Sequence, residues 1–89
     1  INANITTSGT QNYAYDDILL GGDVTLTSTA GDIIAYGNID GGNNDFTVSN
    51  AGSSSELGGV MSNMTSFTKQ GTGFLLVYGN NTYSGDTTV

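Results

Sequence analysis

The feature that most constrains the fold of this sequence is a repeat with a period of 21 to 22 residues. Residues of similar type recur at this spacing in several columns that keep nearly the same phase. The columns are Ala3, Val24, Phe46, Phe67 and Val89; Ile5, Leu26 and Val48; Tyr15, Tyr36, Leu57 and Tyr78; Ile18, Ile39 and Val60; and Gly37, Gly58 and Gly79. Self-similarity at a fixed period of this length is the sequence signature of a solenoid.

Each period has the pattern of short β-strands separated by turns. Residues 24–27 and 46–49 alternate apolar and hydroxyl side chains, and residues 74–78 form one apolar run. Clusters of Gly, Asn and Asp separate these runs, and no segment keeps the 3.6-residue period of an amphipathic helix. The sequence therefore predicts an all-β protein, a right-handed parallel β-helix (β-solenoid) with about four coils of 21–22 residues.

We expect one solenoid segment over residues 1–89, with coils at approximately 1–22, 23–44, 45–65 and 66–89. Equivalent residues of successive coils then lie above one another at a strand spacing of about 4.8 Å. The inward residues Val24, Phe46 and Phe67 are predicted to form one apolar stack, and the tyrosine-containing column is predicted to form a second. The glycine column is assigned to corners that require positive φ.

Residues 51–66 fit the repeat least well, because Ser53–Glu56 replace the strand residues of the neighbouring coils. A bulge or protruding loop is predicted here. Such a loop is a candidate contact site.

The composition excludes most catalytic and nucleic-acid-binding functions. The chain has no Cys and no His, and Lys69 is its one basic residue against eight acidic ones, for a formal net charge of −7. A single cation cannot neutralise a phosphate backbone, and the apolar runs are too short for a membrane helix. We therefore expect no enzymatic activity, no cofactor, no nucleic-acid partner and no direct membrane insertion.

Two polar columns are predicted on the outer face of the strands. They comprise Asn4, Thr25, Thr47 and Thr68, with Thr6, Thr27, Ser49 and Gln70 beside them. A regular array of hydroxyl groups is suited to ordering water against ice or to binding a glycan. This makes Thr25, Thr27, Thr47 and Thr68 the candidate ligand-binding residues. The alternative is that solvent-facing strand positions simply favour Thr.

Acidic residues in the turns raise the question of a metal site. Asp23 and Asp45 are the candidate calcium ligands, because the repeat stacks their carboxylates and Ca²⁺ takes oxygen ligands. The ligand spacing of known calcium loops is absent. Solvated turn acids are therefore the alternative interpretation, and no metal is assigned.

The ends of a solenoid expose unpaired backbone groups. The sequence shows neither an amphipathic helix nor a charged cap at its termini. We expect a longer solenoid, a capping partner, or end-to-end stacking of identical subunits into a filament. The residues assigned to these assembly edges are Ile1, Ala3, Ile5, Tyr83 and Val89.

Residues 67–89 contain Lys-x-Gly-x-Gly, an apolar strand and Gly-x-Asn-Thr-Tyr-x-Gly-x-Thr-x-Val. The matching residues are Lys69, Gly71, Gly73, Gly79, Asn81, Thr82, Tyr83, Gly85, Thr87 and Val89. This segment resembles the passenger-associated β-strand repeat of bacterial autotransporters, except at Asp86 and Phe74. Residues 6–13 and 24–33 resemble the repeats of filamentous-haemagglutinin-like adhesins.

The resemblance implies a structural β-helical stalk segment of a secreted or surface-displayed adhesin or autotransporter passenger. Such a protein is associated with the outer membrane of a Gram-negative bacterium, and the repeat supports progressive folding during secretion. Its partners would be adjacent coils or identical subunits, together with a host glycan or protein receptor. A self-assembling filament subunit and a glycan- or ice-binding module remain the alternatives.

Overall fold

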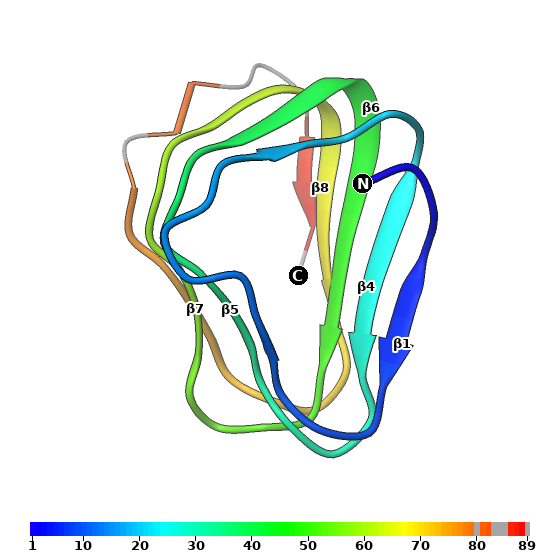
Figure 1. Cartoon of the computed structure of the whole chain (residues 1–89), viewed down its shortest axis with the longest axis vertical. Helices are drawn as coiled ribbons and strands as arrows, with labels where there is room; N and C mark the ends of the chain where they lie inside the picture. The colour runs from blue at the N-terminus through cyan, green and yellow to red at the C-terminus, as the bar shows by residue number, and fades with distance from the viewer. Residues whose placement is uncertain (80, 83–85, 89) are drawn as a thin grey trace.

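A computed structural model describes residues 1–79, 81–82 and 86–88. It shows the predicted all-β parallel β-solenoid, with about three turns in place of the four coils expected from the repeat (Figure 1). No helix within these residues is long and apolar enough to cross a membrane. The strands are β1 (Ile5–Thr7), β2 (Gln11–Asn12), β3 (Ile18–Leu19), β4 (Val24–Ser28), β5 (Ile33–Ala35), β6 (Ile39–Asn50), β7 (Ser55–Leu57), β8 (Met61–Gln70), β9 (Leu75–Val77) and β10 (Asp86–Thr88).

The strands of successive turns stack along the solenoid axis and form two parallel sheets. Sheet A has the order β1-β4-β6-β8-β10, with β3 also paired to β6, and sheet B has the order β2-β5-β7-β9. Three steps of one turn each separate the first strand of sheet B from the last. In Figure 1 the chain runs clockwise as it recedes from the viewer, which makes the solenoid right-handed.

The interior stack of sheet A confirms the predicted register. Val24 pairs with Phe46 and Phe46 with Phe67, and all three side chains are buried. The two phenylalanine rings lie with their centroids 5.8 Å apart. Leu26 likewise lies between Ile5 and Val48. Because each turn buries its apolar residues against the next, a modest apolar content is sufficient for a core.

The predicted interior column of tyrosines is wrong. Leu57 pairs with Ala35 and Val77, not with tyrosines. Tyr36 directly follows Ala35, and Tyr78 directly follows Val77. Since successive side chains of a strand point to opposite faces, these tyrosines project outward. Tyr78 is accordingly 51% exposed.

Two other columns are also displaced by one or two residues. Ile39 pairs with Met61, which is fully buried, and not with Val60. Phe67 pairs with Thr87, so that the last repeat is two residues shorter than predicted, and Val89 lies outside the described residues. Irregularities in the pairing of β6 with β8 accompany the shift at Met61.

The glycine column exists, but its members and its physical reason differ from the prediction. Gly59, and not Gly58, stacks between Gly37 and Gly79. A Cβ atom on Gly59 would lie 2.0 Å from the carbonyl oxygen of Gly37, and one on Gly79 would lie 2.0 Å from that of Gly59. None of these glycines has positive φ. Close approach of the backbones, not backbone conformation, therefore excludes a side chain.

The irregularity predicted within residues 51–66 lies near the end of that range and not at the serine run, because the pairing of β6 with β8 passes from Asn44–Met64 to Asp45–Ser66 and skips Thr65. Strand β7 starts at Ser55 and pairs in register with both β5 and β9. The Ser55 side chain is fully buried, and its Oγ accepts a hydrogen bond of 2.9 Å from the Ile33 amide. The small hydroxyl therefore fits inside the turn as a backbone partner.

Candidate functional site

The two polar columns lie on the outer face of sheet A, as predicted. Thr25 pairs with Thr47 and Thr47 with Thr68, while Thr27 pairs with Ser49. These side chains are half-buried rather than fully exposed. Parallel register thus holds the hydroxyl-bearing residues in rows, but ligand binding by Thr25, Thr27, Thr47 and Thr68 stays a prediction.

The two calcium candidates make hydrogen bonds within the protein. The Asp23 carboxylate accepts a hydrogen bond of 2.8 Å from the Asp45 amide, and the Asp45 carboxylate accepts one of 2.8 Å from the Ser66 hydroxyl. Among the described residues, no group of three or more acidic side chains could hold a metal ion. The geometry gives both carboxylates a structural role between turns, and calcium binding stays a prediction.

Asp23 belongs to a wider set of side chains that cap the following turn. In each case, a carboxylate or amide oxygen accepts a hydrogen bond from the backbone N–H 21 or 22 residues later. Besides Asp23 with Asp45, the pairs are Asn4 with Thr25, Asp17 with Asn38, Asp32 with Ser54 and Asn38 with Val60. The turn residues therefore join adjacent coils where the strand ladders are interrupted, a role that the sequence reading missed.

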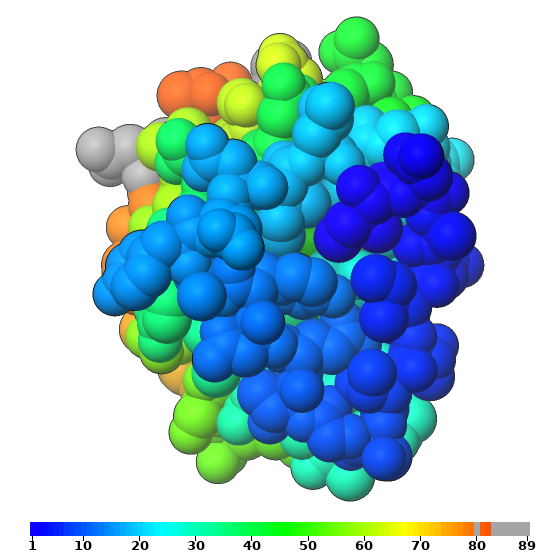
Figure 2. All heavy atoms as spheres, in the orientation of Figure 1, coloured from blue at the N-terminus to red at the C-terminus, as the bar shows by residue number. Residues whose placement is uncertain are grey.

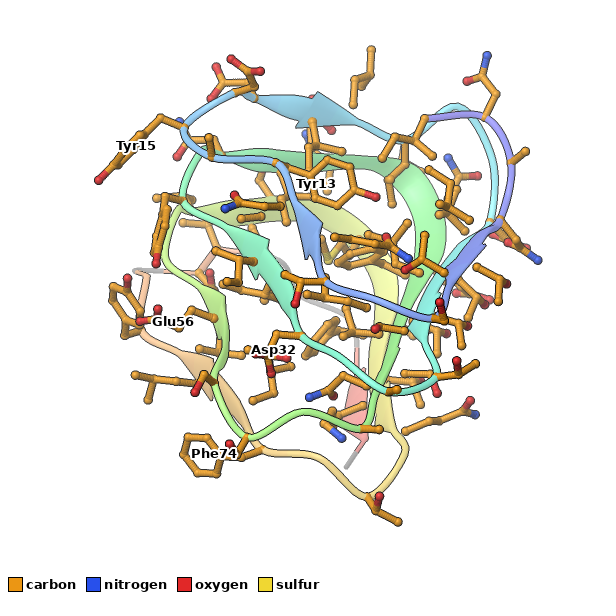
Figure 3. All side chains as sticks on the ribbon, turned by 60° about the horizontal axis from the view of Figure 1, so that its bottom comes forward. Tyr13, Tyr15, Asp32, Glu56 and Phe74 are labelled. Atoms are coloured by element: carbon orange, nitrogen blue, oxygen red, sulfur yellow. The ribbon has the colours of Figure 1, made fainter. Side chains whose placement is uncertain are left out.

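The N-terminal end of the solenoid is partly closed by two side chains. Tyr13 extends across the interior (Figure 3), and its hydroxyl donates a hydrogen bond of 2.6 Å to Gln11 Oε1. Gln11 Nε2 donates in turn to the carbonyl of Thr27 at 2.8 Å. Side chains of the first coil cover this end of the molecule (Figure 2). Burial accordingly raises the pKa of Tyr13.

The predicted assembly edges are only partly described. Ile1 and Ile5 are half-buried against the core, whereas Ala3 is exposed. Within the described residues, β1 pairs on one side only, with β4, so its other edge is open. Tyr83 and Val89 lie outside the described residues.

A group of aromatic side chains and one carboxylate occupies the corner of the solenoid beside sheet B. We call Tyr15, Tyr36, Glu56 and Tyr78 the tyrosine cluster. The rings of Tyr15 and Tyr36 lie 5.2 Å apart at an interplanar angle of 31°. The Tyr36 hydroxyl donates a hydrogen bond of 2.8 Å to Glu56 Oε2. The ring of Tyr78 covers Gly58, where a Cβ atom would lie 2.7 Å from the tyrosine hydroxyl.

Local backbone geometry brings Tyr15 to this cluster. Ala14 has φ of 50°, a left-handed conformation that is uncommon for alanine, and its amide donates to Asn12 Oδ1 at 2.8 Å. The turn leaves Tyr15 80% exposed at the outside of the solenoid. Figure 3 shows Tyr15 and Glu56 on the same side of the molecule.

The negative charge of Glu56 acts on the neighbouring phenols. The hydrogen bond to Glu56 raises the pKa of Tyr36, with smaller effects from desolvation and from the Glu56 charge. Desolvation, followed by the Glu56 charge, raises the pKa of Tyr78. The cluster is therefore a region of negative potential among aromatic rings. The alternation of residues around positions 36 and 78 is the sequence signal that could have placed these two tyrosines on the outside.

Comparison with family models, with curated proteins and with solved structures finds no match for this chain. The structure defines the solenoid architecture of the chain. The biological role proposed below is inferred from that geometry.

Proposed function

We propose that this chain is a structural stalk segment of a secreted or surface-displayed bacterial adhesin or autotransporter passenger. In this role it has no catalytic activity, and it positions other parts of the protein at a distance from the outer membrane. The observation that carries the proposal is the in-register stacking of Val24, Phe46 and Phe67 across successive turns. This arrangement extends by repetition of one kind of interface.

The contacts between turns support a protein that folds stepwise. Each capping pair, such as Asp23 with Asp45, joins a residue to the next coil only. The strand pairs also connect only neighbouring coils, since Leu26 pairs in register with Ile5 of the preceding coil and with Val48 of the following coil. A solenoid of such nearest-neighbour interfaces folds by propagation from one turn to the next. This property suits a chain that emerges progressively at a cell surface.

The test is to add one coil to the open edge of β1. A second copy of residues 22–43 is fused ahead of Ile1, which keeps a 22-residue spacing between Leu26 of the copy and Ile5, and the control fusion carries the same 22 residues in scrambled order. We expect the native-sequence coil to raise both the free energy of unfolding and the urea m-value, because it adds one interface and more buried surface. Equal free energies of unfolding and equal m-values for the two fusions would contradict the proposal of a stalk segment.

Surface display is tested separately. The chain is placed between a secretory signal and an outer-membrane β-barrel in a Gram-negative host, and its exposure is measured by protease digestion of intact cells. We expect the chain to reach the surface, and the destabilised variant Gly59→Ala to be displayed less. Retention of the unaltered chain in the periplasm would count against an adhesin or autotransporter stalk.

The open edge of β1 favours one alternative, a filament subunit. Ile5 and Thr7 pair only with β4 within the described part of the chain, and Ile5 remains half-exposed. End-to-end stacking would complete this ladder and bury Ile5. Electron microscopy would then show fibres with a subunit repeat of roughly 20 Å, set by four strand layers. Persistent monomers at high concentration would exclude the filament and leave the stalk.

A further inference from the structure

The outer faces of the two sheets differ in chemistry. Sheet A carries the hydroxyl rows, whereas the strand β9 of sheet B is flanked and lined by exposed apolar side chains. Phe74 is 59%, Leu76 44% and Tyr78 51% exposed. Their alternate positions place them in one row on the outer face of the strand. Figure 3 shows Phe74 on the side of the molecule that also carries Glu56 and Tyr15.

Glu56 lies within this apolar surface without a cationic partner from its own chain. Lys69 is the one basic side chain of the sequence, and its amine donates to the carbonyl oxygens of Gln70 and Gly71. The N-terminal amine donates to the carbonyl oxygen of Leu19. The negative charge of Glu56 is therefore balanced by no ion pair in the described residues, and the chain as a whole carries a net charge of −7.

The arrangement selects for a planar cation. A guanidinium group stacks on aromatic rings, forms paired hydrogen bonds with a carboxylate and is weakly hydrated. The ring of Tyr15 is largely exposed for stacking, and Glu56 is held in place by the Tyr36 hydroxyl. We propose that the tyrosine cluster binds an arginine side chain of a protein partner, with the row of Phe74 and Leu76 contacting apolar residues beside that arginine.

A neutral glycan fits this surface less well. Tyr15 and Tyr36 stack on each other at 5.2 Å, so they do not present a flat platform of two rings. A neutral sugar also makes no use of the uncompensated charge of Glu56, and an acidic sugar is repelled by it. The unbalanced charge of Glu56 therefore favours a basic protein segment. This inference is independent of the stalk function.

The experiment measures binding of three probes to the intact chain. They are a blocked peptide with one arginine between leucines, the same peptide with lysine, and a neutral hexasaccharide. Binding is measured by isothermal titration calorimetry and, in a separate titration, by tyrosine fluorescence. The tyrosine emission is not masked by tryptophan, because the chain contains no Trp. We expect saturable binding of the arginine peptide, about fivefold tighter than binding of the lysine peptide, since lysine lacks the planar fork.

Matched variants separate this site from general charge attraction. Glu56→Gln is expected to weaken arginine-peptide binding about tenfold, the scale of one charged hydrogen bond. Asp45→Asn removes the same charge on sheet A while retaining an acceptor for Ser66, and is expected to change binding less than about twofold. Tyr15→Ala tests the stacking and is expected to weaken binding about fivefold. Circular dichroism and thermal unfolding confirm that each variant is folded.

Three results would overturn the proposal. The first is equal weakening by Glu56→Gln and Asp45→Asn, which would show attraction by net charge alone. The second is binding of the hexasaccharide in place of the arginine peptide. The third is the absence of saturable binding of the arginine peptide at millimolar concentration.

Discussion

Replacing Gly59 by alanine tests the stacking of the backbone at one corner of the solenoid. The added Cβ would lie 2.0 Å from the carbonyl oxygen of Gly37, which is 1.4 Å short of the 3.4 Å at which ordinary contact begins. Separating the coils by this amount breaks the neighbouring hydrogen bonds from Gly58 N to Ala35 O and from Ile39 N to Val60 O, both 2.9 Å long. The contact also has no flexible side chain that can move aside.

The cost follows from these contacts. Loss of two backbone hydrogen bonds contributes about 2 kcal/mol, and overpacking adds at least about 1 kcal/mol. We therefore expect Gly59→Ala to lower the free energy of unfolding by about 3 kcal/mol, which corresponds to a decrease of about 12 to 24 °C in Tm for a domain of this size. Urea and thermal unfolding followed by circular dichroism measure both quantities.

The matched control is Gly9→Ala. No atom lies within 4 Å of a Cβ built on Gly9, and its φ is not positive. This substitution is expected to be neutral or to stabilise the protein by about 0.5 kcal/mol, because alanine restricts the unfolded chain. Equal stabilities of the Gly9→Ala and Gly59→Ala variants would refute the close stacking of Gly37, Gly59 and Gly79.

Three further predictions concern the core, the caps and the phenols. Phe46→Ala removes a fully buried ring from the central stack and is expected to lower the free energy of unfolding by about 3 to 5 kcal/mol in urea titration. Asp23→Ala is expected to lower the free energy of unfolding by about 1 kcal/mol, whereas Asp23→Asn retains most of that stability by keeping an acceptor for the Asp45 amide. Added Ca²⁺ should leave the Tm of the unaltered protein unchanged, and a rise in Tm would instead support a calcium site. The hydrogen bond to Glu56 raises the pKa of Tyr36 above its ordinary value of 10.0. The hydrogen bond therefore stabilises the fold fully below pH 10.0, and this stabilisation is lost as the pH rises through the folded-state pKa. The fall in the free energy of unfolding at alkaline pH should be smaller for Tyr36→Phe.

The repeat predicted the fold because sheet A keeps its register over most of its length. The spacing of Val24, Phe46 and Phe67 correctly indicated stacked turns, and the hydroxyl residues between them correctly indicated an outer face. Strict alternation within β4 and over residues 46–50 of β6 made the inward side unambiguous. The repeat does not by itself define a family, because one fold carries many unrelated functions.

The tyrosine cluster was missed because identical residues were aligned in preference to local alternation. Tyr36 and Tyr78 are two coils apart, but the chain between them places Gly58, and not Leu57, in their column. A displacement of one residue transfers a side chain from the interior to the surface. The hydrogen bond between Tyr36 and Glu56 depends on this corrected register, so it could not be predicted from the period alone.

The capping role of Asp23 was likewise not predicted, because the sequence suggested only a calcium ligand or a solvated turn acid. Its carboxylate accepts a hydrogen bond from the Asp45 amide at 2.8 Å. Such a contact depends on the direction of one side chain at a corner. The repeat places residues above one another, but it does not determine their rotamers.

The most direct test of the account is the register of the stacked turns, measured by disulfide formation. The chain contains no Cys, so a pair of introduced cysteines can form only the disulfide under test. Thr25 and Thr47 are neighbours in register, whereas Thr68 lies one strand further along the sheet. Adjacent strands lie about 4.8 Å apart, within the range of about 4.4 to 6.8 Å between Cα atoms that a disulfide spans, and strands two apart lie beyond it. Mass spectrometry after mild oxidation is therefore expected to show a disulfide within the monomer in Thr25→Cys/Thr47→Cys and free thiols in Thr25→Cys/Thr68→Cys. Cross-linking of the second pair within a monomer, or failure of the first, would contradict the stacked parallel solenoid.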